Sequence, residues 1–245
     1  IITFLNFFVE KLLTKYNYLK KLIKNINQKV QYLYIKLFIR DKFKSQVALW
    51  YADNYRNETK RLDYPKLNQQ STVFDLGGYL GDFAYDINQK YSCKVYLFEP
   101  HPKFFEKCYI RFKNNKNIHV FNYGIGYKDG MFYLSDRLDD SSFENPNHVN
   151  KKSIKCEIRD FLKVIEDLDI QKIDLMKINI EGDEYKLLNH ILNNDKITFT
   201  DQYQIQFHNF VEGAENKREK IISELQKTHR RTWCYEFVWE NWELI

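Results

Sequence analysis

The sequence changes character at residues 75–81, which read Asp75-Leu76-Gly77-Gly78-Tyr79-Leu80-Gly81. The chain holds only eight glycines among its 245 residues, so three within this stretch mark a special turn. The apolar residues 72–76 predict a buried strand before the turn, and residues 80–90 predict a helix after it. Glycine at such a turn lets a ligand approach the backbone, and the helix presents unpaired N–H groups to it. The stretch therefore predicts a ligand-binding strand–turn–helix unit.

An acidic residue follows the next expected strand, which covers residues 94–98. This residue is Glu99, 18 positions after Gly81. A carboxylate there can accept hydrogen bonds from both hydroxyls of a ribose. The acid at Asp75 repels phosphate but suits the ammonium group of an amino acid. The pattern therefore favours S-adenosylmethionine over NAD, whose fingerprint is G-x-G-x-x-G. The alternative is a tight turn in which Asp75 caps the helix.

Strands and helices alternate along the rest of the chain. This alternation predicts an α/β fold with a mostly parallel sheet and helices on both faces. Residues 135–152 are polar and predict a loop. Further strands are expected at 118–122, 131–134, 173–180, 203–207, 233–238 and 242–244, and further helices at 103–113, 184–193 and 217–228.

The strand at 173–180 carries an unusual row of polar residues. Lys177, Asn179 and Glu181 alternate with apolar residues and so point to one side. Glu181 falls at the carboxyl end of the strand, where open α/β sheets bind ligands. Polar groups on a central strand are costly unless they have partners. Either these residues form an active site, or Lys177 makes a structural ion pair with Glu181 or Glu184.

A histidine closes the next expected strand. His208 follows residues 203–207, and its ordinary pKa suits general-base catalysis near neutral pH. Gln206 lies on the same side of that strand and can orient a substrate. We therefore expect both side chains near Glu181.

The N-terminal segment differs in charge from the rest. Residues 1–45 carry ten Lys or Arg and two Asp or Glu, whereas the remainder carries 28 basic and 31 acidic residues. Apolar residues from Leu5 to Ile26 recur every three or four positions and predict an amphipathic helix. Such a helix either packs on the catalytic body or binds a partner or an anionic membrane surface. We expect an N-terminal helical extension at 1–69 and a second domain at 70–245.

Composition excludes several classes of protein. The acidic balance of the main body argues against a nucleic-acid substrate, because phosphate backbones need a basic track. The four cysteines contain no C-x-x-C pair, which excludes a zinc ribbon and favours reduced thiols in the cytoplasm. No run of about 18 uncharged apolar residues is present to span a membrane. The apolar start at residues 1–9 lacks the basic region and cleavage site of a signal peptide.

Several segments taken together resemble the FkbM family of methyltransferases. The resemblance covers about residues 70–245 and implies the class I methyltransferase (Rossmann-like) fold, with a seven-stranded mixed sheet ending in an antiparallel hairpin. It also implies S-adenosylmethionine as cofactor and methylation of a hydroxyl, often on a sugar or a polyketide. The segments are residues 75–81, Phe98-Glu99-Pro100-His101-Pro102, residues 122–130, Lys177-Ile178-Asn179-Ile180-Glu181-Gly182-Asp183-Glu184 and the strand ending in His208.

The resemblance also implies roles for individual residues. The family segment usually reads K-I-D-x-E-G, and this chain has Asn179 in place of the acid. We expect an O-methyltransferase that acts on a hydroxyl of a sugar, a glycan or a nucleotide-sugar and uses no metal ion. Its partner is a small-molecule or glycan substrate, and the sequence is compatible with an oligomer. The rivals are a methyltransferase of a small-molecule or lipid-linked acceptor at a membrane surface, such as the inner face of a membrane, and an inactive cofactor-binding scaffold. The expected residues are Asp75, Gly77, Gly78, Gly81, Glu99, Asn122 and Gly124 for the cofactor, Asn179 and Gln206 for the substrate, and Lys177, Glu181 and His208 for catalysis.

Overall fold

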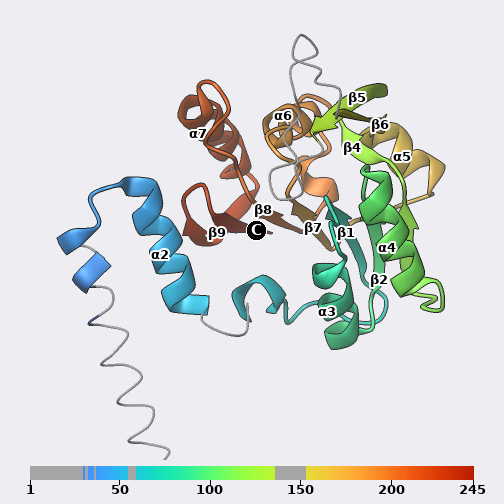
Figure 1. Cartoon of the computed structure of the whole chain (residues 1–245), viewed down its shortest axis with the longest axis horizontal. Helices are drawn as coiled ribbons and strands as arrows, with labels where there is room; N and C mark the ends of the chain where they lie inside the picture. The colour runs from blue at the N-terminus through green and yellow to red at the C-terminus, as the bar shows by residue number, and fades with distance from the viewer. Residues whose placement is uncertain (1–29, 31–32, 36, 55–58, 136–152) are drawn as a thin grey trace, which may run out of the picture. The chain divides into compact units, whose positions relative to one another are not determined.

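The computed structural model describes residues 30, 33–35, 37–54, 59–135 and 153–245 (Figure 1). These residues fall into two compact units, Ile1–Glu58 and Thr59–Ile245. The first contains helix α2 (Lys42–Asn54). The stripe expected between Leu5 and Ile26, and the loop expected at 135–152 apart from its first residue, lie outside the described residues. Within the described ranges, no helix has the length and apolarity needed to cross a membrane.

A seven-stranded mixed sheet forms the centre of the second unit, as the sequence predicts. Its order is β3-β2-β1-β7-β8-β10-β9. In this sheet β3, β2, β1, β7 and β8 are parallel, and β10 runs antiparallel to both β8 and β9. The expected closing hairpin is thus confirmed. The strands are β1 (Thr72–Leu76), β2 (Lys94–Phe98), β3 (Ile118–Phe121), β7 (Leu175–Ile178), β8 (Gln202–Ile205), β9 (His229–Tyr235) and β10 (Trp239–Leu244).

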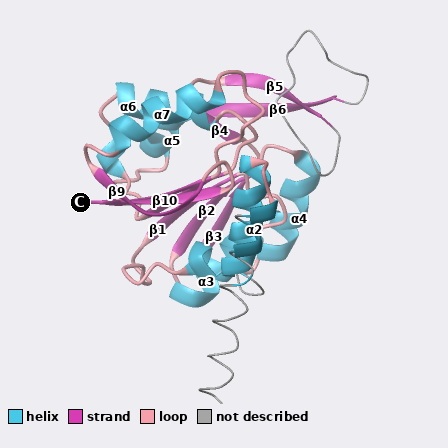
Figure 2. Cartoon of the chain, turned by 90° about the vertical axis from the view of Figure 1, so that its left-hand side faces the viewer, coloured by secondary structure: helices cyan, strands magenta, loops and turns pink. Residues whose placement is uncertain are grey.

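Helices cover both faces of this sheet (Figure 2). Side chains alternate along β1, so Phe74 and Leu76 enter the apolar core that contains residues of α5, α6 and α7. Val73 enters the other core, which contains residues of α3 and α4. Most of these side chains are fully buried, so their transfer from water drives the folding of the unit. The helices are α3 (Asp82–Tyr91), α4 (Pro102–Phe112), α5 (Phe161–Asp167), α6 (Glu184–Asn193) and α7 (Ala214–Leu225), with the short helices η1 (Thr59–Leu62) and η3 (Ile197–Phe199).

Local sequence explains where several helices begin. Pro102 stands at the first turn of α4, and the His101 side chain accepts a hydrogen bond from the Lys103 amide at 3.2 Å. Helix α7 begins at Ala214, three residues before the expected start, because Gly213 turns the chain there with a φ of 67°. Both helices begin in segments that follow the carboxyl ends of parallel strands, α4 after β2 and α7 after β8.

A second, three-stranded sheet was not predicted. Its order is β4-β6-β5, with β4 at Gly124–Gly126, β5 at Gly130–Ser135 and β6 at Ser153–Asp160. Only the central part of β5 was expected. Strand β6 shows clear period-two alternation, in which apolar Ile154, Cys156 and Ile158 are separated by polar residues. That pattern should have identified β6 from the sequence.

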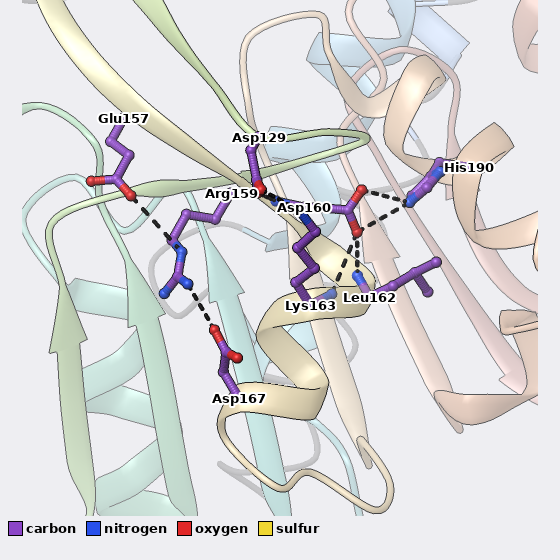
Figure 3. Close-up of polar contacts among 8 residues, drawn as sticks. All are labelled: Asp129, Glu157, Arg159, Asp160, Leu162, Lys163, Asp167 and His190. Carbon is purple, nitrogen blue, oxygen red and sulfur yellow. Dashed lines mark hydrogen bonds and ion pairs between the residues drawn. The ribbon is translucent and has the colours of Figure 1, made fainter.

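Charged side chains join the small sheet to the neighbouring helices (Figure 3). Asp160 caps α5 through the Leu162 amide at 2.8 Å and lies 3.2 Å from His190 of α6. Asp129 accepts from the Asp160 amide at 2.8 Å and pairs with Lys163 at 2.6 Å. These contacts fix the start of α5 to the loop that follows β4.

Candidate active site

The predicted site residues gather at one edge of the main sheet. Glu99 follows β2, Asn122 follows β3, and residues 179–181 and 206–208 follow β7 and β8. Because these strands are parallel, their carboxyl ends meet at the same edge. The glycine turn after β1 lies in the middle of this edge, since β1 pairs with both β2 and β7.

Close packing explains why glycine occupies the turn after β1. Gly77 has a φ of 80°, and a Cβ atom there would lie 1.9 Å from the carbonyl oxygen of Asn179. Any side chain would therefore push the turn away from the segment after β7. The amides of Gly77 and Gly78 donate to the Phe98 carbonyl at 3.0 and 3.2 Å. These two amides hold the turn to β2, although the sequence suggested a role in ligand binding.

Glu99 is held by the same turn. Its carboxylate accepts hydrogen bonds from the backbone amides of Tyr79 at 2.7 Å and His101 at 2.9 Å. Burial raises the pKa of Glu99 to about 7, against the lowering effect of these amides. Each carboxylate oxygen retains a lone pair for another donor. The geometry can therefore present an acceptor pair to a diol.

Asp75 and Lys177 form a buried ion pair beneath the turn. The two residues are register partners on β1 and β7, and the Lys177 Nζ lies 2.8 Å from Asp75 Oδ1. Lys177 also donates to the carbonyls of Gly77 at 2.6 Å and Leu76 at 3.3 Å. This pairing replaces the structural ion pair with Glu181 or Glu184 that the sequence left open. The contacts of the Lys177 ammonium are thus with Asp75 and with the carbonyls of Leu76 and Gly77, and a catalytic role for Lys177 stays a prediction.

Two oxygen atoms near the turn have unused accepting capacity. Among the residues that the structure describes, Asp75 Oδ2 and Asn179 Oδ1 are buried and have no hydrogen-bond partner. A buried acceptor without a donor is costly. The two atoms therefore suit a ligand that brings N–H donors to the turn.

His208 lies between two carboxylates. Its Nδ1 is 2.9 Å from Glu184 Oε1, and its Nε2 is 3.5 Å from Glu181 Oε2. Glu184 is fully buried and also accepts from the amides of Ile180 at 2.9 Å and Gly182 at 3.0 Å. An ionised carboxylate only accepts, so Nδ1 carries the proton and Nε2 is the atom left for chemistry.

The carboxylates change the acidity of this histidine. Burial alone would lower the pKa of His208, but the hydrogen bond to Glu184 and the charges of Glu184 and Glu181 outweigh it. The pKa of His208 is therefore raised above its ordinary 6.5. His208 becomes a base only as the pH rises through this higher value.

The remaining predicted residues lie around this centre. Asn122 is exposed after β3. Gln206 is half-buried after β8, and its backbone N–H donates to the Ile178 carbonyl at 2.9 Å. Gly124 is buried in β4, and a Cβ atom there would lie 2.6 Å from Ile158. The structure thus gives Gly124 a packing role, and its predicted contact with the cofactor is untested.

Glu184 is the residue that the site prediction left out. The sequence places it at the start of a helix, where an acid is common for reasons of helix stability alone. Its distinguishing signal is the four-residue spacing from Ile180, which lets the side chain reach back to the amides of the preceding turn. Glu181 also departs from expectation, because a φ of 55° takes it out of the strand.

The sheet order, the glycine turn after β1 and the carboxylate after β2 define a class I methyltransferase fold. The sequence pattern of the methyltransferase FkbM domain matches residues 75–238. The chain therefore belongs to the FkbM family of methyltransferases, and its cofactor is S-adenosylmethionine.

The chain is also similar in fold to solved structures of low sequence identity. An rRNA methylase from Streptococcus thermophilus is 12% identical, with 73% of this chain and 89% of that chain covered and a TM-score of 0.43. Aeropyrum pernix fibrillarin with bound S-adenosyl-L-methionine is 8% identical, with 78% and 75% covered and a TM-score of 0.44. Precorrin-6y C5,15-methyltransferase from Geobacter metallireducens is 7% identical, with 75% and 83% covered and a TM-score of 0.42. No curated protein matches the sequence.

The residues present fit this cofactor. Glu99 would hold the ribose hydroxyls, and the unused oxygens of Asp75 and Asn179 would accept from the ammonium group. Asn179 would then contact the cofactor, whereas the sequence predicts a role for it toward the substrate. In the described ranges, no three histidine, cysteine, aspartate or glutamate side chains are grouped to hold a metal ion.

Cofactor affinity should depend on the ionisation of Glu99. With a pKa of about 7, the carboxylate is mostly protonated at pH 6 and mostly ionised at pH 8. Only the ionised form accepts from two hydroxyls, so affinity should fall about tenfold from pH 8 to pH 6. Calorimetric titration of S-adenosylhomocysteine measures this change. Glu99→Gln should bind weakly with a flat profile, and an equally steep profile in that variant would assign the titration to another group.

Proposed function

We propose that this methyltransferase acts on a hydroxyl of a sugar, a glycan or a nucleotide-sugar. The observation that carries the proposal is the placement of His208 between Glu184 and Glu181, which follow the Asn179 carbonyl that packs against Gly77. A sugar hydroxyl is a very weak acid and a poor nucleophile unless a base takes its proton. A histidine held by a buried carboxylate is such a base.

The contacts assign a separate task to each residue. Glu184 fixes the imidazole through Nδ1 and stabilises the imidazolium that forms, as the carboxylate does in other acid–histidine pairs. Nε2 of His208 is placed to take the hydroxyl proton. S-adenosylmethionine would supply the methyl group from its positively charged sulfur: the bond from carbon to sulfur would break as the bond from carbon to the acceptor oxygen forms, and S-adenosylhomocysteine would leave. Glu181 lies beside Nε2 and can accept a hydrogen bond from a second hydroxyl of the sugar.

The charge of the site favours a sugar over a nucleic acid. Two carboxylates flank the base, and residues 46–245 carry 31 acidic against 28 basic side chains. The negatively charged phosphate backbone of a nucleic acid would be repelled by these carboxylates. We therefore propose a small-molecule or glycan partner that presents hydroxyl groups. The free thiols of the four cysteines support a cytoplasmic location, which we also propose.

The test is a screen of acceptors for methyl transfer. Purified protein is incubated with labelled S-adenosylmethionine and a panel of glycosides, nucleotide-sugars, polyketides and RNA. We expect methylated sugar as the product. Its yield should rise as the pH rises through the pKa of His208, which lies above 6.5. Methyl transfer to RNA alone would overturn the proposal. Cofactor binding without transfer to any acceptor would favour the scaffold alternative.

The basic N-terminal segment supports a second role at a membrane surface. Its ten basic and two acidic residues over positions 1–45 would be attracted to anionic lipid. We expect the full chain to sediment with vesicles containing phosphatidylserine and to be released by high salt. A variant with Lys20, Lys21 and Lys24 changed to Glu should stay in solution. Equal sedimentation of the two proteins would remove the membrane role.

A further inference from the structure

An exposed aromatic ring stands beside the catalytic histidine. The Phe210 side chain is 58% exposed, and its ring centroid lies 5.1 Å from that of His208. Exposed apolar residues are common on protein surfaces and usually need no explanation. Phe210 differs because it adjoins a base and two carboxylates, where solvent and substrate must enter.

The backbone holds this ring in place. Gly182 has a φ of 103°, and a Cβ atom there would lie 3.3 Å from Phe210 Cε2 and 3.0 Å from Val211 Cγ2. The turn between Glu181 and Glu184 therefore packs against the segment that carries Phe210. His208 precedes Phe210 by two residues in the segment between β8 and α7, and the two rings meet at an interplanar angle of 46°. Two neighbours thus restrict the ring while one part of it faces solvent.

From this geometry we infer that Phe210 is the stacking platform for the sugar ring of the acceptor. The inference rests on the proposed function and narrows its substrate to an uncharged pyranose ring. A pyranose has an apolar C–H face and a rim of hydroxyls. The C–H face suits the electron-rich face of Phe210. The rim then reaches His208 Nε2 and the Glu181 carboxylate, which lie 3.5 Å apart.

The same arrangement argues against an acidic ring at this position. Glu181 and Glu184 both lie within 4 Å of His208, so a carboxylate or phosphate on the reacting ring would meet like charges. In a nucleotide-sugar, the phosphates would lie away from these carboxylates. Phe210 is thus assigned to specificity, and it positions the acceptor for the base.

The test compares ring acceptors with open-chain ones. Methyl β-glucopyranoside, methyl α-mannopyranoside and methyl α-rhamnopyranoside supply rings, and sorbitol supplies hydroxyls without a ring. Phe210→Ala should raise KM for the ring acceptors about tenfold and leave sorbitol unchanged. Phe210→Trp should retain the low KM. Tyr109→Ala, which removes another exposed ring on α4, is the matched control and should change neither value.

Binding is also measured without turnover. Saturation-transfer NMR is recorded in the presence of S-adenosylhomocysteine. The ring C–H protons of the glycosides should give a saturation-transfer signal with the wild type, and this signal should be lost with Phe210→Ala. Methylation of sugars with the same KM in both proteins would overturn the inference and leave the proposed function intact. Neither binding nor methylation of any glycoside by the folded wild type would overturn both.

Discussion

Replacement of His208 by Gln should lower kcat by about 10²–10⁴-fold, the range for loss of a general base. Gln keeps the size and a hydrogen-bonding group beside Glu184 but cannot take a proton. The affinity for S-adenosylhomocysteine should stay within about twofold, because cofactor binding is assigned to Glu99 and the turn after β1. Single-turnover methyl transfer and calorimetry measure the two effects. A fall in kcat below threefold would remove His208 from the mechanism.

Glu184 provides an independent check on the same base. Glu184→Gln removes the charge that raises the pKa of His208. The rise of kcat with pH should therefore move to lower pH in this variant. A merely structural carboxylate would not shift the profile. His190→Gln is the control, because His190 also pairs with a carboxylate, at 3.2 Å from Asp160, but lies in the cluster that joins α5 and α6.

The main sheet could be predicted because its signals are local. The buried run before the glycine turn, the second strand before Glu99 and the helices between them each show their own period. Strand β6 shows such a period too, in Ile154, Cys156 and Ile158. The loop expected at 135–152 ends where β6 begins, and no element was expected at residues 153–160. Its partner strands β4 and β5 are shorter and show a weaker pattern, and β4 has only three residues.

The set of residues at the site could be predicted in part, because the carboxyl ends of parallel strands meet at one edge of the sheet whichever side chains follow them. The ion pairs and hydrogen bonds between these residues could not be predicted. Lys177 and Glu181 were expected on the same side of one continuous strand, with an ion pair from Lys177 to Glu181 or Glu184 as the alternative. Strand β7 ends at Ile178, and the left-handed backbone of Glu181 turns the chain. That turn frees Lys177 for Asp75 and brings Glu184 under His208. Only contacts between distant segments decide such pairings.

Replacement of Lys177 by Met should destabilise the fold by about 3–5 kcal/mol, the usual cost of leaving one buried charge without its partner. Asp75 and Lys177 have side-chain exposures of 1% and 5%, so water cannot compensate the remaining carboxylate. The double variant Asp75→Asn, Lys177→Met removes both charges and should recover most of the loss. Urea unfolding of the three proteins measures the free energies of unfolding.

The control is Lys172→Met, which removes a lysine paired with Asp201 at 2.6 Å in a much more exposed place. That change should cost less than about 1 kcal/mol. The double variant carries a second piece of information. Because Lys177 donates to the carbonyls of Leu76 and Gly77, its loss should loosen the glycine turn and weaken cofactor binding even where stability recovers. Full recovery of both properties would show that Lys177 does no more than neutralise Asp75. A single variant as stable as wild type would contradict the assigned cost of leaving the Asp75 carboxylate buried without Lys177.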